Sequence, residues 1–408
     1  MIRPEQLYAS PNALAPHYRR FDVANRLLLT GHSHQAWPDR AFEGQSRAWI
    51  DAAKYVDEKW ELAFGRAERV RRGYARLLGD RDGEIALAAN THDLVVRFIS
   101  ALPLRERPRL VTTDGEYHSL RRQLDRLAEE GIEVVKVAAA PADAVAERLA
   151  GAVDDRTAAA FVSSVFYLDA RIVRGLGHVM EACRRHGAEL LVDAYHHLNV
   201  VPFSIRDEGL EDAYIVGGGY KYCQLGEGNG FIRIPPACTL RPVVTGWFSE
   251  FGTMADPPRG GVPYGTGADR FAGATYDPTS HYRAAEVFDF FEELRLTPEL
   301  LREVSQHQVR LLARAFDNLD LDPRLIDRDR DVDLSEIGGF LALRSPQAGH
   351  IRKRLLERGV LTDSRGEYLR LGPAPYLSDT QLTDAVGILG ECVRDLPTRT
   401  PRGPCSNV

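Results

Sequence analysis

An aspartate and a lysine stand directly after two apolar runs in the middle of the chain. The run 190–192 ends in Asp193, and the run 214–216 leads through Gly217-Gly218-Gly219 to Tyr220 and Lys221. Residues that end parallel strands gather outside the carboxyl edge of a sheet, where ligands bind. The pattern therefore predicts a carboxylate and an amine that face one crevice.

Such a pair suits pyridoxal 5′-phosphate (PLP). A lysine amine can hold the aldehyde of this cofactor as a Schiff base, and a carboxylate can keep its pyridine nitrogen protonated, so that the ring withdraws electrons. The glycines let the backbone turn tightly and approach a phosphate closely. Taken singly, Asp193 could be a helix cap and Lys221 a surface lysine. Together they predict a PLP-dependent enzyme that acts on an amino acid.

Short apolar runs alternate with amphipathic segments around this pair. Strands are expected over 84–89, 109–114, 133–138, 158–167, 189–194, 213–217 and 230–234. Helices are expected over 41–78, 119–130, 141–150 and 177–186. Strands separated by helices indicate βαβ units, so the expected fold class is α/β with a doubly wound, mostly parallel sheet.

At 408 residues the chain is longer than one core usually supports. The rhythm changes after about residue 265, where further helices are expected over 282–294, 298–319 and 349–358, with a strand over 338–343. We expect four parts. They are an N-terminal segment over 1–60 that packs with the small domain, a large PLP-binding domain over 61–275, a smaller α+β domain over 276–396, and a flexible tail over 397–408.

Composition excludes several classes of partner. A net charge of -6 with 27% charged residues gives no reason to expect nucleic acid or a membrane surface. No apolar run approaches the ~18 residues of a membrane helix, and the N-terminus does not resemble a signal peptide. The five cysteines are scattered, without a Cys-x-x-Cys spacing. A cytoplasmic protein with reduced thiols is expected.

Four motifs, in this order along the chain, resemble kynureninase and its relatives among the class V aminotransferase-like enzymes. They are Asp193-Ala194-Tyr195-His196, Gly219-Tyr220-Lys221-Tyr222 with Gly226, Gly246-Trp247-Phe248, and Arg370-Leu371-Gly372-Pro373. The likeness spans about Leu27 to Pro375. It implies the PLP-dependent transferase fold type I, with a smaller α+β C-terminal domain, and a homodimer whose active site is shared between subunits.

The resemblance also implies which residues hold the cofactor. Asn90 and Thr91 match residues that cradle the phosphate at a helix N-terminus. His118 matches the aromatic residue that stacks on the ring, although Tyr117 can take this place in the alignment. His196 matches a histidine that supports the cofactor pocket.

Three further positions match contacts to the phosphate, the substrate or the neighbouring subunit. Tyr220 and Trp247 match phosphate or substrate contacts, although Trp247 could equally be core packing. Thr275 resembles a Gly-Thr turn that reaches the phosphate of the neighbouring subunit. An obligate dimer is the consequence.

The substrate end matches the family less closely. Arg370 matches the arginine that grips the substrate α-carboxylate, a task suited to two parallel hydrogen bonds. His32 and Ser33 occupy the place of a Gly-Asn-Ser segment that lines the substrate end, with His32 where the family has Asn. Phe166 replaces a polar residue near the ring, and Glu227 with Asn229 interrupts the expected Gly-Pro-Gly. The substrate is therefore expected to differ from that of an ordinary kynureninase.

If the resemblance extends to chemistry, Lys221 removes the α-proton, water attacks a γ-carbonyl, and the Cβ–Cγ bond breaks to release alanine, with Tyr220 as proton donor. A class V aminotransferase, an epimerase or another lyase stays open, because the same lysine, aspartate and arginine serve those reactions. A cysteine desulfurase needs a cysteine before the arginine, and residues 362–368 contain none.

Two readings stand outside this group of reactions. A metal-dependent hydrolase on the His32-x-His34 and His196-His197 pairs is a remote alternative, because no His-Glu-x-x-His run accompanies them, and no metal is expected. A catalytically silent PLP-binding protein is disfavoured by the intact Lys221, Asp193 and Arg370.

Overall fold

The structure is a computed structural model that describes residues 2–80, 83–252, 254 and 260–396. The expected tail over 397–408, with Cys405, lies outside the described residues, as does a part of the loop that follows Trp247. Within the described ranges, no helix is both long enough and apolar enough to cross a membrane.

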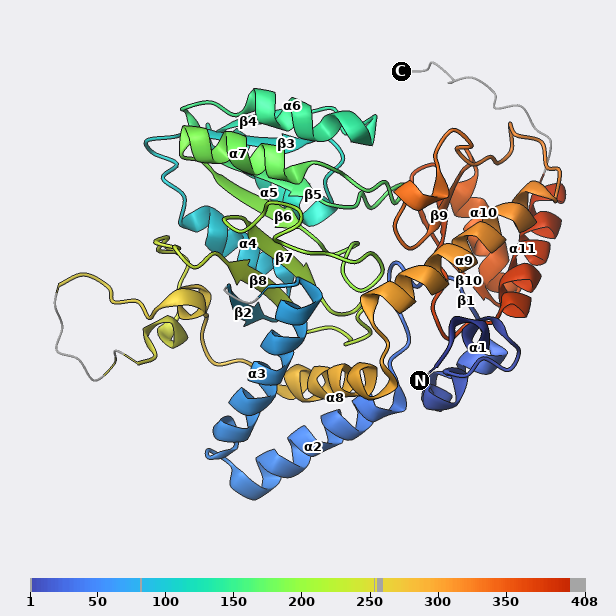
Figure 1. Ribbon diagram of the computed structural model, residues 1–408, viewed down its shortest axis with the longest axis horizontal. Coiled ribbons are helices and arrows are strands. Elements are labelled where there is room, and N and C mark those ends of the chain that lie inside the picture. The colour runs from blue at the N-terminus through green and yellow to red at the C-terminus, as the bar shows by residue number, and fades with distance from the viewer. Residues whose placement is uncertain (1, 81–82, 253, 255–259, 397–408) are drawn as a thin grey trace, which may run out of the picture.

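A seven-stranded sheet lies at the centre of the larger part of the chain (Figure 1). Its strands are β2 (Glu84–Ala88), β3 (Arg109–Thr113), β4 (Glu133–Val137), β5 (Thr157–Ser163), β6 (Glu189–Asp193), β7 (Tyr214–Gly218) and β8 (Gly230–Ile234). Their order is β2-β8-β7-β6-β5-β3-β4, and β3 to β7 run parallel, whereas β8 is antiparallel to both neighbours. The predicted doubly wound, mostly parallel sheet is confirmed.

Helices cover both faces of this sheet. They are α4 (Thr91–Ser100) and α5 (His118–Glu129) on one face, and α6 (Val145–Ala152) and α7 (Leu176–His186) on the other. The central strand β5 is buried along its whole length. Ala160 and Val162 join one apolar cluster, and Ala159 with Phe161 joins the other. Alternating side chains of one apolar strand thus fill the core on both sides, as expected for a parallel sheet.

The order of the strands reverses at β3. The chain leaves β3 through α5 to reach β4 on one side, and returns through α6 to β5 on the other side. Ligands of open α/β sheets bind outside the carboxyl ends of the strands at such a reversal. The loops that follow β3 and β5 therefore mark where a ligand is expected.

A second, antiparallel sheet forms the smaller part. It has the strands β11 (Asp363–Arg365), β12 (Tyr368–Leu371) and β9 (Leu341–Arg344), in that order. The helices α9 (Pro298–Asp317), α10 (Ala348–Glu357) and α11 (Asp379–Arg394) pack around it.

The N-terminal segment lies against this smaller part. Its strand β1 (Leu27–Leu28) pairs in parallel with β10 (Val360–Leu361), so segments more than 300 residues apart in the sequence lie side by side. The pairing continues where Gly31 N donates to Gly372 O at 2.8 Å. This contact brings His32 to the end of β12.

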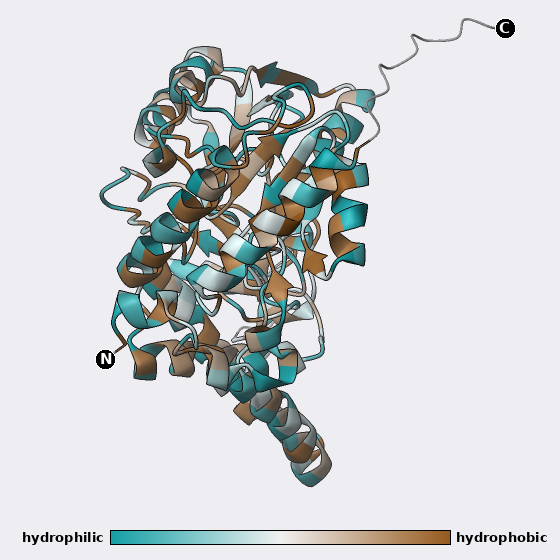
Figure 2. Ribbon diagram, turned by 90° about the vertical axis from the view of Figure 1, so that its right-hand side faces the viewer, coloured by the Kyte–Doolittle hydropathy of each residue, from teal (hydrophilic) through white to brown (hydrophobic). Residues whose placement is uncertain are grey.

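The helical region expected over 41–78 is two helices, α2 (Asp39–Tyr55) and α3 (Lys59–Leu77). The break falls at Val56, whose φ is 49°, and the chain reverses there. Both helices pack on α8 (Thr279–Leu294), and their joined tip extends from the rest of the molecule (Figures 1 and 2). The remaining short helices are α1 (Pro4–Tyr8), η1 (Ala15–His17), η2 (Arg19–Phe21), η3 (Val23–Asn25), η4 (Ala142–Ala144), η5 (Trp247–Glu250), η6 (Gly267–Phe271) and η7 (Leu334–Glu336).

Candidate active site

Lys221 lies in a tight turn that follows β7. The turn is closed by two backbone bonds, from Leu225 N to Gly219 O at 2.9 Å and from Gln224 N to Lys221 O at 3.1 Å. A Cβ on Gly219 would lie 2.6 Å from the Leu225 side chain, so the turn requires glycine there. It directs Lys221 inward, with 5% of the residue exposed. Of the five lysines in the chain, all of them described, Lys221 is the buried one.

The Lys221 amine faces aromatic rings and one carboxylate. Its Nζ lies 4.3 Å from the centroid of the Tyr195 ring and 5.4 Å from that of Tyr117. Burial lowers the pKa of Lys221 to about 7, and the charge of Asp193 opposes part of this shift. The amine is therefore available in its unprotonated, nucleophilic form near neutral pH.

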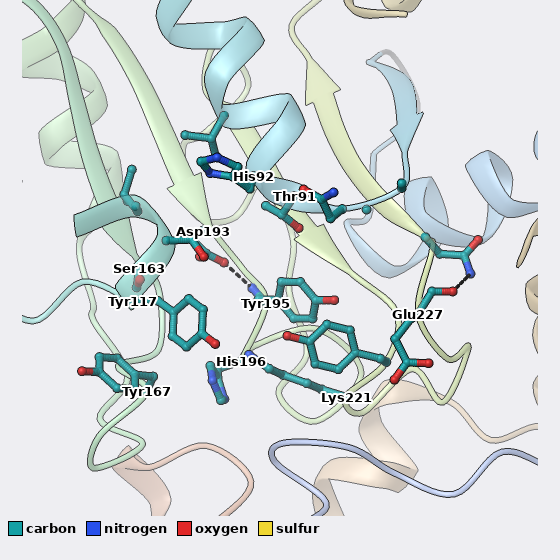
Figure 3. Close-up of a pocket in the computed structure, with 18 of the residues that line it drawn as sticks. Thr91, His92, Tyr117, Ser163, Tyr167, Asp193, Tyr195, His196, Lys221 and Glu227 are labelled. Carbon is teal, nitrogen blue, oxygen red and sulfur yellow. Dashed lines mark hydrogen bonds between the residues drawn. The ribbon is translucent and has the colours of Figure 1, made fainter. Parts of the chain in front are cut away.

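Asp193 ends β6, beside Ser163 of β5 and Val216 of β7. Its Oδ1 accepts a hydrogen bond from Tyr195 N at 2.8 Å (Figure 3). Burial raises the pKa of Asp193, while Lys221 opposes that shift. An acid and a base whose pKa values both depart from normal in one crevice are typical of a functional site.

These groups line a cavity of about 330 Å³ at the carboxyl edge of the sheet (Figure 3). It is lined by Ala89, Asn90, Thr91, His92, Val95, Tyr117, Ser119, Leu120, Ser163, Val165, Tyr167, Asp193, Tyr195, His196, Tyr220, Lys221, Glu227, Gly228, Asn229 and Gly230. Six of the expected cofactor residues are among them, namely Asn90, Thr91, Asp193, His196, Tyr220 and Lys221. The predicted crevice thus brings together most of the expected cofactor residues.

His118 is placed differently from the expectation. Tyr117 lines the cavity, whereas His118 begins α5 and does not line it. The His118 ring packs instead against that of Tyr167, with 5.2 Å between the ring centroids. Because Tyr117 takes the extended conformation of an N-cap, its side chain diverges from that of the next residue. Of the two rings that the sequence offered, Tyr117 is the one in position to stack on a bound ring.

One end of the cavity is formed by the start of α4. Asn90 caps this helix, accepting from Asp93 N at 2.9 Å, and Thr91 Oγ1 donates to Gly217 O at 2.8 Å. Gly230 of β8 passes directly beneath, and a Cβ there would lie 2.5 Å from the Asn90 carbonyl carbon. A capped helix N-terminus with unsatisfied N–H groups favours an anion such as a phosphate.

His196 and Tyr220 also line the cavity. In the described part of the chain, His196 Nδ1 is buried without a hydrogen-bond partner. Burial lowers the pKa of His196 well below its usual value, so the ring is neutral. Tyr220 stacks on His34 with 4.8 Å between centroids, and burial raises its pKa to about 12. Both groups can exchange a hydrogen bond with a ligand while keeping a fixed charge.

Arg370 lies behind the cavity and does not line it. Its Nε donates to Asp363 Oδ1 at 2.7 Å, its Nη2 donates to Asp363 Oδ2, and its Nη1 donates to Tyr167 O. His32 Nε2 also contacts Asp363 Oδ1 at 2.9 Å. The two expected substrate residues are thus joined through a carboxylate that the sequence analysis missed. The Asp363-x-Arg365 pair shortly before Arg370 is the signal that could have found it.

Ser33, the third expected substrate residue, does not line the cavity; its hydroxyl contacts His34 Nδ1 at 3.1 Å. Trp247 and Thr275 also lie away from Lys221. They contact each other, with Trp247 Nε1 donating to Thr275 Oγ1 at 3.3 Å, and 46% of Trp247 is exposed. Thr275 lines a second cavity of about 780 Å³, which adjoins the first at Ala89, Glu227 and Gly228.

The histidine pairs do not come together as a metal site. In the ranges that the structure describes, no three His, Cys, Asp or Glu side chains are grouped so that they could hold a metal ion. His32 and His196 instead both pack against the Phe340 ring, with centroid distances of 4.6 and 6.0 Å.

Comparison with curated proteins finds three similar chains, while no family model matches. A kynureninase from Pseudomonas fluorescens is 26% identical, covering 93% of this chain and 92% of its own length. The uncharacterized aminotransferase YcbU from Bacillus subtilis is 22% identical over 83% of this chain and 87% of its own. An isopenicillin N epimerase from Streptomyces clavuligerus is 27% identical over 79% and 84%.

Solved structures share the fold. A mutant of C-DES with glycine linked to its PLP cofactor has a TM-score of 0.79 and 15% identity, covering 92% of this chain and 98% of that one. A cysteine desulfurase from Thermococcus onnurineus has a TM-score of 0.74 and 16% identity, covering 91% and 95%. The expected fold type I is thereby confirmed.

Proposed function

We propose that this chain is a PLP-dependent enzyme of the class V, fold-type I group, and that it hydrolyses the Cβ–Cγ bond of an amino acid, as a kynureninase does. The observation that carries the proposal is the one buried lysine, Lys221, which faces Asp193 in a cavity at the carboxyl edge of the sheet. Similarity to kynureninase over 93% of the chain supports the choice of reaction.

The residues around the cavity fit the cofactor. Gly230 lets the start of α4 lie close against β8, because a Cβ there would meet the Asn90 backbone, and His196 Nδ1 has no hydrogen-bond partner among the described groups. In our proposal Lys221 bonds the aldehyde carbon, Asp193 pairs with the ring nitrogen, and the start of α4 holds the phosphate. Tyr117, in place of His118, stacks on the ring.

The chemistry divides between the cofactor and the chain. When bound, PLP supplies an electron-withdrawing ring that stabilises negative charge at the substrate Cα. Lys221, with a pKa of about 7, can take the α-proton because its amine is neutral in about half of the molecules at that pH. Tyr220, with a pKa of about 12, keeps its proton and can deliver it to Cβ when the Cβ–Cγ bond breaks. Water adds to the γ-carbonyl, so the products are alanine and a carboxylic acid.

Recognition of the α-carboxylate is assigned to Arg370. A guanidinium has five N–H donors, and Asp363 with Tyr167 O engages three of them. Among the described residues, the remaining N–H groups on Nη1 and Nη2 have no other side-chain or backbone acceptor, and Tyr167, whose carbonyl Arg370 holds, lines the cavity through which a substrate carboxylate would reach them. Asp363 and His32 would hold the guanidinium in a fixed plane for that contact.

A class V aminotransferase or epimerase is the alternative function. It is supported by the similarity to YcbU and to isopenicillin N epimerase, and by Glu227, which interrupts the expected Gly-Pro-Gly and lines the cavity. Both reactions would use the same Lys221 and Asp193. They differ from hydrolysis in leaving the substrate carbon skeleton intact.

The experiment is to incubate the cofactor-loaded protein with kynurenine, 3-hydroxykynurenine and a panel of amino acids, and to identify the products by mass spectrometry. The proposal predicts alanine in equal amount to an aromatic or acyl acid. Keto acid without alanine would indicate an aminotransferase instead, and an inverted amino acid would indicate an epimerase.

We also propose that the active site is shared in a homodimer. Thr275 and the exposed Trp247 form a hydrogen-bonded pair beside the second cavity, away from Lys221 of their own chain. That position suits residues that reach the cofactor phosphate of a second copy. The large adjoining cavity gives room for the segment that the second copy would insert in return.

A further inference from the structure

A second buried carboxyl group, that of Glu116 in the loop that follows β3, is hydrogen-bonded to Ser163 in the cavity wall. The residue is 2% exposed. Its Oε1 accepts from Thr113 Oγ1 at 2.6 Å and from Ser163 N at 3.2 Å, and its Oε2 accepts from Ser163 Oγ at 2.6 Å. Three donors from two strand ends hold the group rigidly at the reversal of the strand order.

Ser163 connects this carboxyl group to the cavity. It ends β5, lies beside Asp193 in the sheet register, and lines the cavity. Because its hydroxyl hydrogen is directed to Glu116, its oxygen can only accept a hydrogen bond on the cavity side. Glu116 thereby fixes the polarity that Ser163 presents to a bound group.

The charges that face Glu116 come from the neighbouring strand ends. Asp193 on β6 is the charged group whose field acts on it, and Lys221 after β7 stands beyond Asp193. Thr113 and Ser163 are neutral. Within the described residues, no Lys, Arg or His nitrogen lies within 4 Å of the Glu116 oxygens. Two carboxyl groups, that of Asp193 in the cavity wall and that of Glu116 behind Ser163, therefore lie near a single amine, that of Lys221.

Resting on the proposed cofactor, we infer that Glu116 is a positioning residue that acts through Ser163 and, together with Asp193, favours the protonated form of the bound cofactor. A negative charge near a titrating group stabilises its protonated state. Burial raises the pKa of Glu116 to about 7, against the hydrogen bonds of Ser163 and Thr113. The negative charge is therefore present above that pH and is removed below it.

The test is a pH titration of the visible absorbance of the cofactor-loaded protein, compared between wild type and Glu116→Gln. Loss of the charge should lower the midpoint of the spectral change by about one pH unit, the size of a through-space interaction across a partly buried site. Glu106→Gln, which removes an exposed glutamate of the same charge, should leave the midpoint in place.

Ser163→Ala provides a second variant, which carries the test if Glu116→Gln does not fold. It keeps the carboxyl group but removes its strongest donor, so Glu116 holds its proton to higher pH and the midpoint should also fall. Midpoints within 0.2 pH unit (about the precision of such a titration) of wild type in both variants would overturn the inference. A wild-type protein without a visible band would instead contradict the proposed function.

Discussion

The Lys221 amine is unusually easy to deprotonate because burial penalises its charge more than Asp193 stabilises it. An amine attacks an aldehyde only in its neutral form. The rate at which cofactor-free protein regains visible absorbance on addition of PLP should therefore rise with pH, with a midpoint near 7. Stopped-flow absorbance measures this rate.

Asp193→Asn should move that midpoint to lower pH, because the carboxylate no longer stabilises the protonated amine. Lys136→Ala, at an exposed position, serves as the control and should behave as wild type. A midpoint near 10.4, the value of an ordinary lysine, would show that the amine is solvated and would contradict its burial.

Asp363 keeps the Arg370 charge compensated inside the protein, where 3% of Arg370 is exposed. Removing one partner of a buried ion pair leaves an uncompensated charge, which typically costs about 3–5 kcal/mol. Asp363→Asn should therefore lower the free energy of unfolding by about 3 kcal/mol in a urea titration. Glu367→Gln breaks the exposed pair with Arg344 and should cost less than about 1 kcal/mol. Equal losses in the two variants would contradict a structural role for Asp363.

For single residues, the sequence predicted correctly those site positions whose side chains have a distinctive chemistry. Lys221 and Asp193 lie together as expected, because strand ends in a parallel sheet converge on one edge. The choice between His118 and Tyr117 could not be made, since it depends on the backbone angles of the residue that precedes α5. Asp363 was missed because a pairing with Arg370 across a tight antiparallel turn leaves no periodic signal.

Among the elements, α4 combines stability with binding. Asn90 caps its first turn, and in our proposal the same turn binds the cofactor phosphate. Asn90→Ala removes the cap and should lower the free energy of unfolding by about 1 kcal/mol. Asn90→Asp keeps a capping oxygen, so its stability should stay close to wild type. Its carboxylate would repel a phosphate, however, and should weaken cofactor binding measured by absorbance titration.

If Asn90→Asp bound the cofactor as tightly as wild type, the phosphate could not lie at this helix start. The Asn90→Ser variant, which caps without adding charge, controls for the change in side-chain size. It should retain both stability and cofactor affinity.

The strands of the large sheet were predictable because each is a short apolar run bounded by turn residues. The helix over 41–78 was predicted as one element, since its apolar periodicity hides the reversal at Val56. The helix α11 and the strands β11 and β12 were not predicted. The signal for α11 was present, since Ser378 and Gln381 form a capping box ahead of an apolar stripe. The strands β11 and β12 are short and mixed in polarity, and their pairing with each other and with β9 leaves no periodic signal.

For the molecule as a whole, exposed apolar side chains lie along α2 and at the turn that joins α2 to α3. They include Phe42, Trp49, Ile50 and Val56, with Trp49 80% and Val56 70% exposed. Large apolar side chains left in water on one element mark a surface that another protein covers. In the proposed homodimer, the protein that covers this surface is the second copy of the chain.

The wild-type protein should therefore show twice the chain mass of 45.5 kDa in light scattering after size exclusion. Trp49→Asp places a charge on the proposed interface and should shift the protein toward 45.5 kDa. As a control, Leu356→Asp places the same charge at an exposed leucine on α10, away from α2, and this variant should remain dimeric. A monomeric wild type would contradict the shared active site.

The central claim is that the cofactor is bonded to Lys221. The most direct measurement is to reduce the PLP-loaded protein with borohydride, digest it, and locate the added mass among the five lysines by peptide mass spectrometry. If Lys221 holds the cofactor, we expect one modified peptide, which contains Lys221, and no visible band in Lys221→Ala. Modification of an exposed lysine such as Lys136 or Lys353 with Lys221 unmodified would contradict it.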